Sequence, residues 1–162
     1  MPPSNQPTLP ESFAQIADDF QALGKQDRLQ LLMEFARELP ALPERYAGDH
    51  DGMERVAECM SPAFVKVELD GGLDDPVRIY FDAPPEAPTT RGFASILSEG
   101  LAGLTARELL EVPDDVPGRL GLSEAISQQR LGGMAGMLGR IKRQVRTGLG
   151  IGSQVPSDLR DA

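Results

Sequence analysis

The sequence predicts an α+β domain in which a small antiparallel β-sheet packs against several α-helices. Three observations predict this class. Apolar residues recur at three- and four-residue spacing near the amino end, apolar and polar residues alternate strictly in two central runs, and helical spacing returns in the last third. The length of 162 residues, with 40% hydrophobic and 25% charged residues, is typical of one soluble globular domain.

We expect a single domain over residues 11–147. Residues 1–10 are polar and proline-rich, so we expect a disordered amino-terminal arm. From Gly148 the chain turns to glycine and polar residues, and we expect residues 148–162 to form a flexible carboxy-terminal tail.

The amino-terminal part of the chain predicts two helices. The first carries an apolar stripe that ends before Gly24, which we expect to stop it. The second is expected over residues 27–39, with Asp27 as its N-cap and Pro40 just after its end. The two stripes comprise Phe13, Ile16, Ala17, Phe20 and Leu23, then Leu29, Leu32, Met33, Ala36 and Leu39.

The central part predicts a β-hairpin after a long loop. Residues 47–58 are polar and aperiodic, which indicates a loop. Residues 63–69 and 77–81 each alternate apolar and polar side chains, which is typical of half-buried strands. The glycine- and aspartate-rich residues 70–75 between them favour a tight turn, so the two strands should pair antiparallel.

The last third predicts further helices. Residues 91–101 carry one apolar stripe. Thr105 and Glu108 have the spacing of a capping box at the start of a short helix. Ser127 is a suitable N-cap for a long final helix that we expect to end near residue 147.

Composition limits the function classes. The net charge of −9 and the pI of about 4.6 argue against nucleic acid or an anionic membrane as the main partner, and favour a basic face on another protein. No run approaches the ~18 apolar residues of a membrane helix, so we expect no membrane span. One cysteine cannot form an internal disulfide, which favours a reducing compartment, and we expect a cytoplasmic protein.

The single cysteine, Cys59, follows the predicted loop and precedes the first predicted strand. A lone cysteine is more often a small buried hydrophobe than a nucleophile, although a loop position suits contact with a partner. Glu54 and Glu58 would disfavour the thiolate and Arg55 would favour it, and the sequence does not decide which of them faces the sulfur. Any sulfur chemistry at Cys59 must be completed by a thiol of another molecule.

Other catalytic and binding motifs are incomplete. His50 is the only histidine, and a cysteine–histidine mechanism also needs an orienting group and an oxyanion hole. Residues 49–51 offer at most three metal ligands in one loop, so we expect no metal site and no bound cofactor. The glycines of the final helix are most simply interpreted as positions of close packing. Its basic run is interpreted as complementing the helix dipole, or as a contact patch. The glycines are Gly132, Gly133 and Gly136, and the basic run is Arg140, Lys142, Arg143 and Arg146.

Taken in order, several segments resemble the SufE family, whose members accept sulfur from cysteine desulfurases in iron–sulfur cluster assembly. The resemblance covers roughly residues 12–147 and implies a SufE/NifU-like two-layer α+β domain. It rests on the segments 31–43, 56–61, 91–94, 120–122, 127–130 and 133–137.

The resemblance implies a function for Cys59. This residue corresponds to the acceptor cysteine, which would take persulfide sulfur from a PLP-dependent cysteine desulfurase, stimulate that enzyme and pass the sulfur to an iron–sulfur cluster scaffold. Arg130, Arg91 and Ser61 would be supporting residues. The simpler interpretation of both arginines is that each is a surface residue at the start of a helix. The protein would be a sulfur-transfer accessory protein rather than a stand-alone enzyme, and a monomer or homodimer.

The chain departs from the family pattern just before Cys59, at Phe64, where a tryptophan is common in the family, and in the segment before the basic-glycine pair at Arg91. Glu58 stands where the family usually has glycine, and a proline-rich segment, residues 84–88, replaces an aspartate-rich loop. Glu58 motivates an alternative function, a non-catalytic adaptor or activator that docks on the desulfurase or scaffold without carrying sulfur. In the carrier hypothesis, the apolar residues expected to shelter the sulfur are Met60, Phe64 and Ile79.

Overall fold

The computed structural model describes residues 9–151, so most of the predicted amino-terminal arm and most of the predicted tail lie outside the described residues. The described chain contains eight helices and three strands. Two of the helices, η1 and η2, are short 3₁₀ helices. In chain order they are α1 (Glu11–Gln21), α2 (Lys25–Arg37), η1 (His50–Gly52), β1 (Glu54–Arg55), β2 (Phe64–Leu69), β3 (Val77–Asp82), α3 (Pro88–Gly100), α4 (Ala106–Leu110), α5 (Val116–Arg119), η2 (Leu122–Glu124) and α6 (Gln128–Leu149).

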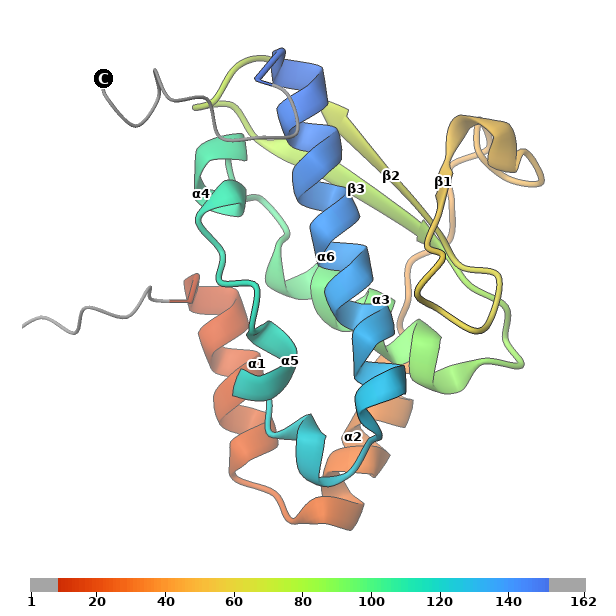
Figure 1. Ribbon diagram of the computed structural model, residues 1–162, viewed down its shortest axis with the longest axis vertical. Helices are drawn as coiled ribbons and strands as arrows, with labels where there is room; N and C mark the ends of the chain where they lie inside the picture. Colours follow the sequence, from red (N-terminus) through yellow and green to blue (C-terminus); the bar gives the residue numbers. More distant parts are fainter. Residues whose placement is uncertain (1–8, 152–162) are drawn as a thin grey trace, which may run out of the picture.

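The arrangement confirms the predicted α+β class. A three-stranded antiparallel sheet, in the order β1-β2-β3, lies along one side of the molecule. Helices α3 and α6 pack against this sheet, and α1 and α2 pack on α3 away from the strands (Figure 1). The core therefore lies between the sheet and the helices, where apolar side chains from both are removed from water.

The predicted hairpin forms the centre of the sheet. β2 pairs antiparallel with β3 in a register that runs from Phe64 opposite Asp82 to Leu69 opposite Val77. Because side chains alternate along a strand, one face of the hairpin is buried against the helices, while the other is more polar.

The polar pattern of residues 47–58 predicts a loop throughout, but the structure has a short strand there. β1 contains only two residues, and it pairs antiparallel with the start of β2. Two residues are too few to give a periodic signal, so their pairing with β2 sets this strand. Beyond β1, Gln144 of α6 occupies the edge of β2, where it accepts from the Val67 amide at 2.8 Å and donates to the Val65 carbonyl at 3.3 Å.

The boundary between α1 and α2 differs from the prediction. α1 ends at Gln21, and Gly24 is not its stop but the N-cap of α2. Asp27, predicted as that N-cap, lies inside the first turn of α2. A carboxylate in the first turn is stabilised by the positive end of the helix dipole, which explains why an acidic residue near a helix start marks its position only approximately.

Two glycines on α3 allow α1 and α2 to approach it closely. A Cβ atom at Gly92 would lie 2.5 Å from a methyl carbon of Leu32 on α2, and one at Gly100 would lie 2.5 Å from the ring of Phe13 on α1. Leu32 and Phe13 are fully buried. The small residues of α3 therefore fix the distance between the helical layers.

The helix-capping predictions for the last third are confirmed. Thr105 and Glu108 form the capping box of α4, and the Ser127 hydroxyl accepts from the Arg130 amide at 3.3 Å at the start of α6. α6 continues to Leu149, past the predicted end near residue 147, because Gly148 is helical and packs against Leu69. Among the described helices, none has the length and apolar character needed to cross a membrane.

Candidate functional site

Cys59 lies at the tip of the loop that joins β1 to β2. The Val56 amide donates to the Ala63 carbonyl at 2.9 Å and closes the base of this loop, while the Cys59 amide donates to the Val56 carbonyl at 3.1 Å. The Cys59 residue is only 7% exposed. The loop position agrees with the sequence, and the structure adds that the thiol is sheltered.

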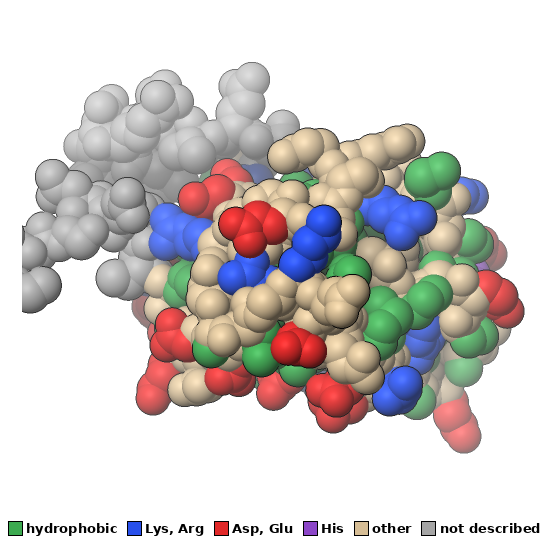
Figure 2. Space-filling model, turned by 90° about the horizontal axis from the view of Figure 1, so that it is seen from below, with side chains coloured by type: hydrophobic (Ala, Val, Ile, Leu, Met, Phe, Trp, Pro, Cys, Tyr) green, Lys and Arg blue, Asp and Glu red, His purple; other side chains and the backbone are tan. Residues whose placement is uncertain are grey.

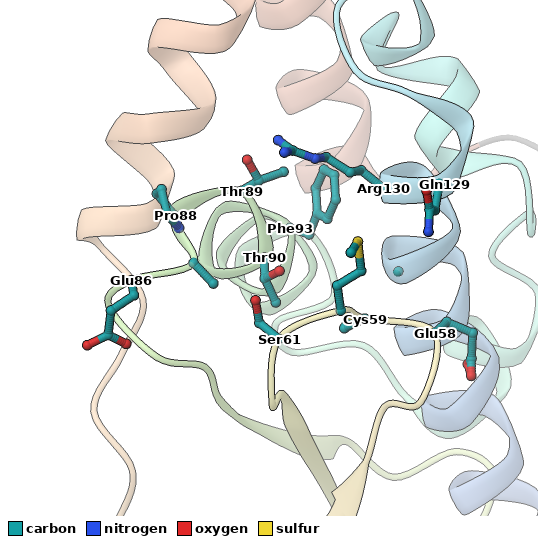
Figure 3. Close-up of a pocket in the computed structure, with 13 residues that line it drawn as sticks. Glu58, Cys59, Ser61, Glu86, Pro88, Thr89, Thr90, Phe93, Gln129 and Arg130 are labelled. Atoms are coloured by element: carbon teal, nitrogen blue, oxygen red, sulfur yellow. The ribbon is translucent and has the colours of Figure 1, made fainter.

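The thiol borders a pocket of about 340 Å³ between its loop, the start of α3 and the start of α6. The sulfur points toward the side of this pocket where Phe93 and Arg130 lie (Figure 3). Thr90, at the start of α3, and Ser61, on the loop, also line it. With Thr89, which also lines the pocket, the site combines one sulfur atom with an aromatic ring, three hydroxyl groups and a guanidinium group.

Glycines of α6 permit the loop to lie against this helix, as the sequence predicts. A Cβ atom at Gly133 would be 3.0 Å from the Cys59 sulfur, and one at Gly136 would be 2.5 Å from a carboxylate oxygen of Glu58. Gly132, by contrast, faces open space. The close packing of Cys59 and Glu58 on α6 thus depends on the absence of side chains at two positions.

Burial raises the pKa of the Cys59 thiol to about 11, with a further upward contribution from the negative charge of Glu58 and a downward contribution from Arg140. Near neutral pH only about one thiol in 10³ to 10⁴ is then ionised in the closed conformation. The closed site therefore holds a thiol, not a ready nucleophile.

The Glu58 carboxylate points away from the sulfur and toward α6 (Figure 3). Arg140 donates to both of its oxygens, at 2.5 Å and 3.3 Å, and also donates to Glu54 of β1 at 2.6 Å. Arg143, one turn further on, pairs with Glu54. The cation that compensates Glu58 is thus Arg140 of the predicted basic run, whereas Arg55 is exposed.

The predicted supporting residues lie in different surroundings. Ser61 and Arg130 line the Cys59 pocket, and the Arg130 guanidinium forms no hydrogen bond or ion pair with any residue in the 9–151 range. Arg91 lies outside the pocket lining. It donates to the Ala83 carbonyl at 2.6 Å and the Ala36 carbonyl at 3.3 Å, which joins the end of β3 to α2.

The residues that shelter the sulfur differ from those expected. Met60 lines the pocket but is 77% exposed, and Phe64 stacks on His50, with ring centroids 3.8 Å apart, on the outer face of the sheet. Ile79 does not line the pocket. Phe93 and Gly133 provide the shelter instead. The apolar stripe around Phe93 indicates only a core position, so the sequence contains no signal that assigns it to this pocket.

His50 has partners away from the thiol. Its Nε2 atom lies 2.6 Å from an Asp82 carboxylate oxygen, and its ring stacks on Phe64. Across the part of the chain that the structure describes, no group of three histidine, cysteine or acidic side chains is arranged to hold a metal ion.

The fold and the site define a small α+β domain built around one buried cysteine that faces a pocket. The chain matches the family model described as "SufE: Fe-S metabolism associated domain" over residues 14–145. It belongs to the SufE family, and its family has a role in iron–sulfur metabolism.

Individual proteins agree with this assignment. An uncharacterised SufE-like protein of Mycobacterium tuberculosis is 50% identical over 139 residues, which cover 86% of this chain and 94% of that protein. One from Rhizobium meliloti is 30% identical over 135 residues, 82% of this chain and 94% of its own length. The solution structure of a hypothetical protein from Thermus thermophilus superposes with a TM-score of 0.75 at 38% identity, covering 88% of this chain and 99% of that one.

Proposed function

We propose that this protein is a sulfur carrier for iron–sulfur cluster assembly, and that the transferred sulfur is carried on Cys59. Cys59 accepts sulfur from a PLP-dependent cysteine desulfurase. The protein stimulates that enzyme and passes the sulfur to a cluster scaffold. The observation that carries the proposal is the position of the only thiol, which faces a pocket with the guanidinium of Arg130 among its lining residues. Membership of a family with a role in iron–sulfur metabolism supports the same function.

The transfer is a substitution at sulfur. The Cys59 thiol loses its proton to solvent, and its thiolate attacks the outer sulfur of a persulfide on the desulfurase. A new S–S bond forms at Cys59 while the S–S bond of the donor breaks. The donor cysteine leaves as a thiolate and takes a proton, so no external oxidant or reductant is needed.

The burial of Cys59 means that the loop has to move for this step. A cysteine on another protein cannot come within bonding distance of a sulfur on a residue that is 7% exposed. We expect the loop to swing outward for transfer and then to return the persulfide to the pocket. There Arg130 would stabilise the negative charge of the persulfide, and Ser61 would offer a hydrogen bond. Arg91 would support the site indirectly by fixing the start of α3.

Charge and exposure favour a protein partner. The net charge of −9 suits docking on a basic face, and acidic side chains line one edge of the molecule (Figure 2). Met60, beside the thiol, offers an apolar contact. We expect an accessory protein, monomeric or homodimeric, that works in the cytoplasm, where a reducing environment keeps its single thiol free.

The test is mass spectrometry after incubation with a cysteine desulfurase and cysteine. The parent protein should gain the mass of one sulfur atom on Cys59, and Cys59→Ser should gain none. If the parent stays unmodified while a known acceptor is loaded, the carrier function is wrong.

The burial and raised pKa of Cys59 also suit the adaptor alternative, in which docking activates the enzyme without sulfur transfer. In a desulfurase assay with labelled cysteine, this alternative predicts that Cys59→Ser keeps full stimulation and that no label appears on either variant. The carrier function predicts label on the parent only.

A further inference from the structure

The residue before Cys59 holds the loop to α6 through one group of contacts. Arg140 donates to both carboxylate oxygens of Glu58, and Gly136 leaves the space in which the Glu58 side chain lies. Gly136 and Arg140 are four residues apart, so they lie on the same face of α6. We call Glu58, Gly136 and Arg140 the Glu58 latch.

We propose that Glu58 is a positioning residue that holds Cys59 closed in its pocket, and that breakage of the Glu58–Arg140 contact releases the thiol for transfer. The use of the released thiol for sulfur transfer rests on the proposed function, but the opening of the loop does not depend on it. Glu58 is adjacent to Cys59 in the chain, so displacement of one from α6 moves the other.

The contact has the properties of a reversible attachment. The side chains of Arg140 and Glu58 are 23% and 38% exposed, so water can solvate both when they separate. Arg140 also pairs with Glu54, which lies on β1 and not at the loop tip. When Glu58 leaves, Arg140 therefore keeps a carboxylate partner, and no unpaired buried charge results.

A purely electrostatic role for Glu58 makes a different prediction. If the loop stayed closed, Glu58 and Arg140 would act only through their opposite effects on the thiol. Loss of Glu58 would then speed thiolate reactions, and loss of Arg140 would slow them. A latch predicts that loss of either residue speeds the reaction, because either change opens the loop.

Gly136→Ala tests the latch without any change of charge. The added Cβ atom would lie 2.5 Å from an oxygen and 2.8 Å from the Cβ of Glu58, so Glu58 must move off the helix. Gly139→Ala is the matched control, because Gly139 lies on the same helix with nothing within 4 Å of an added Cβ. Arg143→Gln is the control for Arg140, since Arg143 pairs with Glu54 and not with Glu58.

The experiment measures the rate at which iodoacetamide, an uncharged reagent, alkylates Cys59 in the full chain. Glu58→Gln, Arg140→Gln and Gly136→Ala should each raise this rate about 1.4-fold to fivefold, the factor expected for loss of a partly exposed ion pair. Gly139→Ala and Arg143→Gln should match the parent, and Arg140→Lys should fall between the parent and Arg140→Gln. A slower reaction in Arg140→Gln, or an unchanged rate in Gly136→Ala, would overturn the latch.

Sulfur loading by a desulfurase, followed in the same variants, separates this inference from the proposed function. If the alkylation rates follow the latch pattern but neither parent nor variants gain sulfur, the carrier function fails and the latch stands. If the parent gains sulfur but all variants are alkylated at the parent rate, the latch fails and the carrier function stands.

Discussion

Arg28 and Arg140 each join segments that are far apart in the chain, but they bind different kinds of group. Arg28 is 8% exposed and donates mainly to backbone carbonyls, whereas Arg140 is partly exposed and binds the carboxylates of Glu54 and Glu58. A buried polar contact that loses its charged donor is poorly compensated by water, but a carboxylate near the surface can turn to water. The first arrangement suits permanent structure, and the second suits the segment that carries Cys59.

The Arg28 contacts show what permanent attachment requires. Its guanidinium donates to the Phe20 carbonyl at 2.9 Å, to the Gly121 carbonyl at 2.8 Å and to Glu124 at 2.9 Å. These acceptors belong to α1, to the residue that precedes η2 and to η2 itself. One buried side chain therefore joins the amino-terminal helices to the segment that leads into α6.

The largest expected effect is at Arg28. Arg28→Gln should reduce the free energy of unfolding by about 2–4 kcal/mol, because a largely buried network loses its charged donor to the Phe20 and Gly121 carbonyls and to Glu124. Urea denaturation measures this loss, and alkylation of Cys59 in the folded variant should stay at the parent rate. A loss as small as that of a surface ion pair would break the distinction between the two arginines.

The pH dependence of alkylation tests the closed state of Cys59. Burial favours the protonated thiol, so its pKa of about 11 is raised in the folded protein. Between pH 7 and 10 the rate should rise about tenfold per pH unit, while the urea-unfolded chain should level off near its ordinary pKa of about 8.5. By linkage, stability should begin to fall as the pH rises above the unfolded value. If the alkylation rate of the folded protein levelled off near pH 9, the thiol would already be exposed.

A smaller effect is expected at the start of α6. Ser127→Ala removes the hydroxyl that accepts from the Arg130 amide and should cost about 1 kcal/mol of unfolding free energy. Thermal unfolding measures it, with Ser123→Ala, at an exposed position of η2, as the control that should behave like the parent. An unchanged melting temperature in Ser127→Ala would show that packing alone fixes this helix start.

The smallest change in stability is expected at Arg140. Arg140→Gln should lower the unfolding free energy by only about 0.2–1 kcal/mol, because its ion pairs are partly exposed. Urea denaturation of Arg140→Gln and Arg28→Gln under the same conditions compares the two losses of unfolding free energy directly. A loss equal to that of Arg28→Gln would indicate that the Cys59 loop is as permanently attached as the helices.

The sequence predicts local features of this fold better than contacts between distant segments. The β2–β3 hairpin, the Thr105 capping box and the Ser127 cap depend on neighbouring residues, and all three are confirmed. β1 is held by its pairing with β2, and Gly24 serves α2 instead of ending α1, so local patterns misplace both.

The same limit applies to the site. The spacing of residues places Cys59 on a loop, but it contains no information about the helix that the loop contacts. Phe93 and Arg140 approach Cys59 and Glu58 only through the tertiary fold, whereas Met60, the chain neighbour of Cys59, lines the same pocket but is exposed. The roles predicted for Arg130, Arg91 and Ser61 stay predictions.

The contact between Gln144 and the edge of β2 has a consequence for solubility. Unpaired strand edges recruit strands from other molecules and promote aggregation. Beyond β1, the Val67 amide is bonded to the Gln144 side chain of α6, which does not belong to the Cys59 loop. Movement of that loop would therefore leave this part of the strand edge occupied, and the protein can expose its thiol to a partner without offering Val67 as a site for self-association.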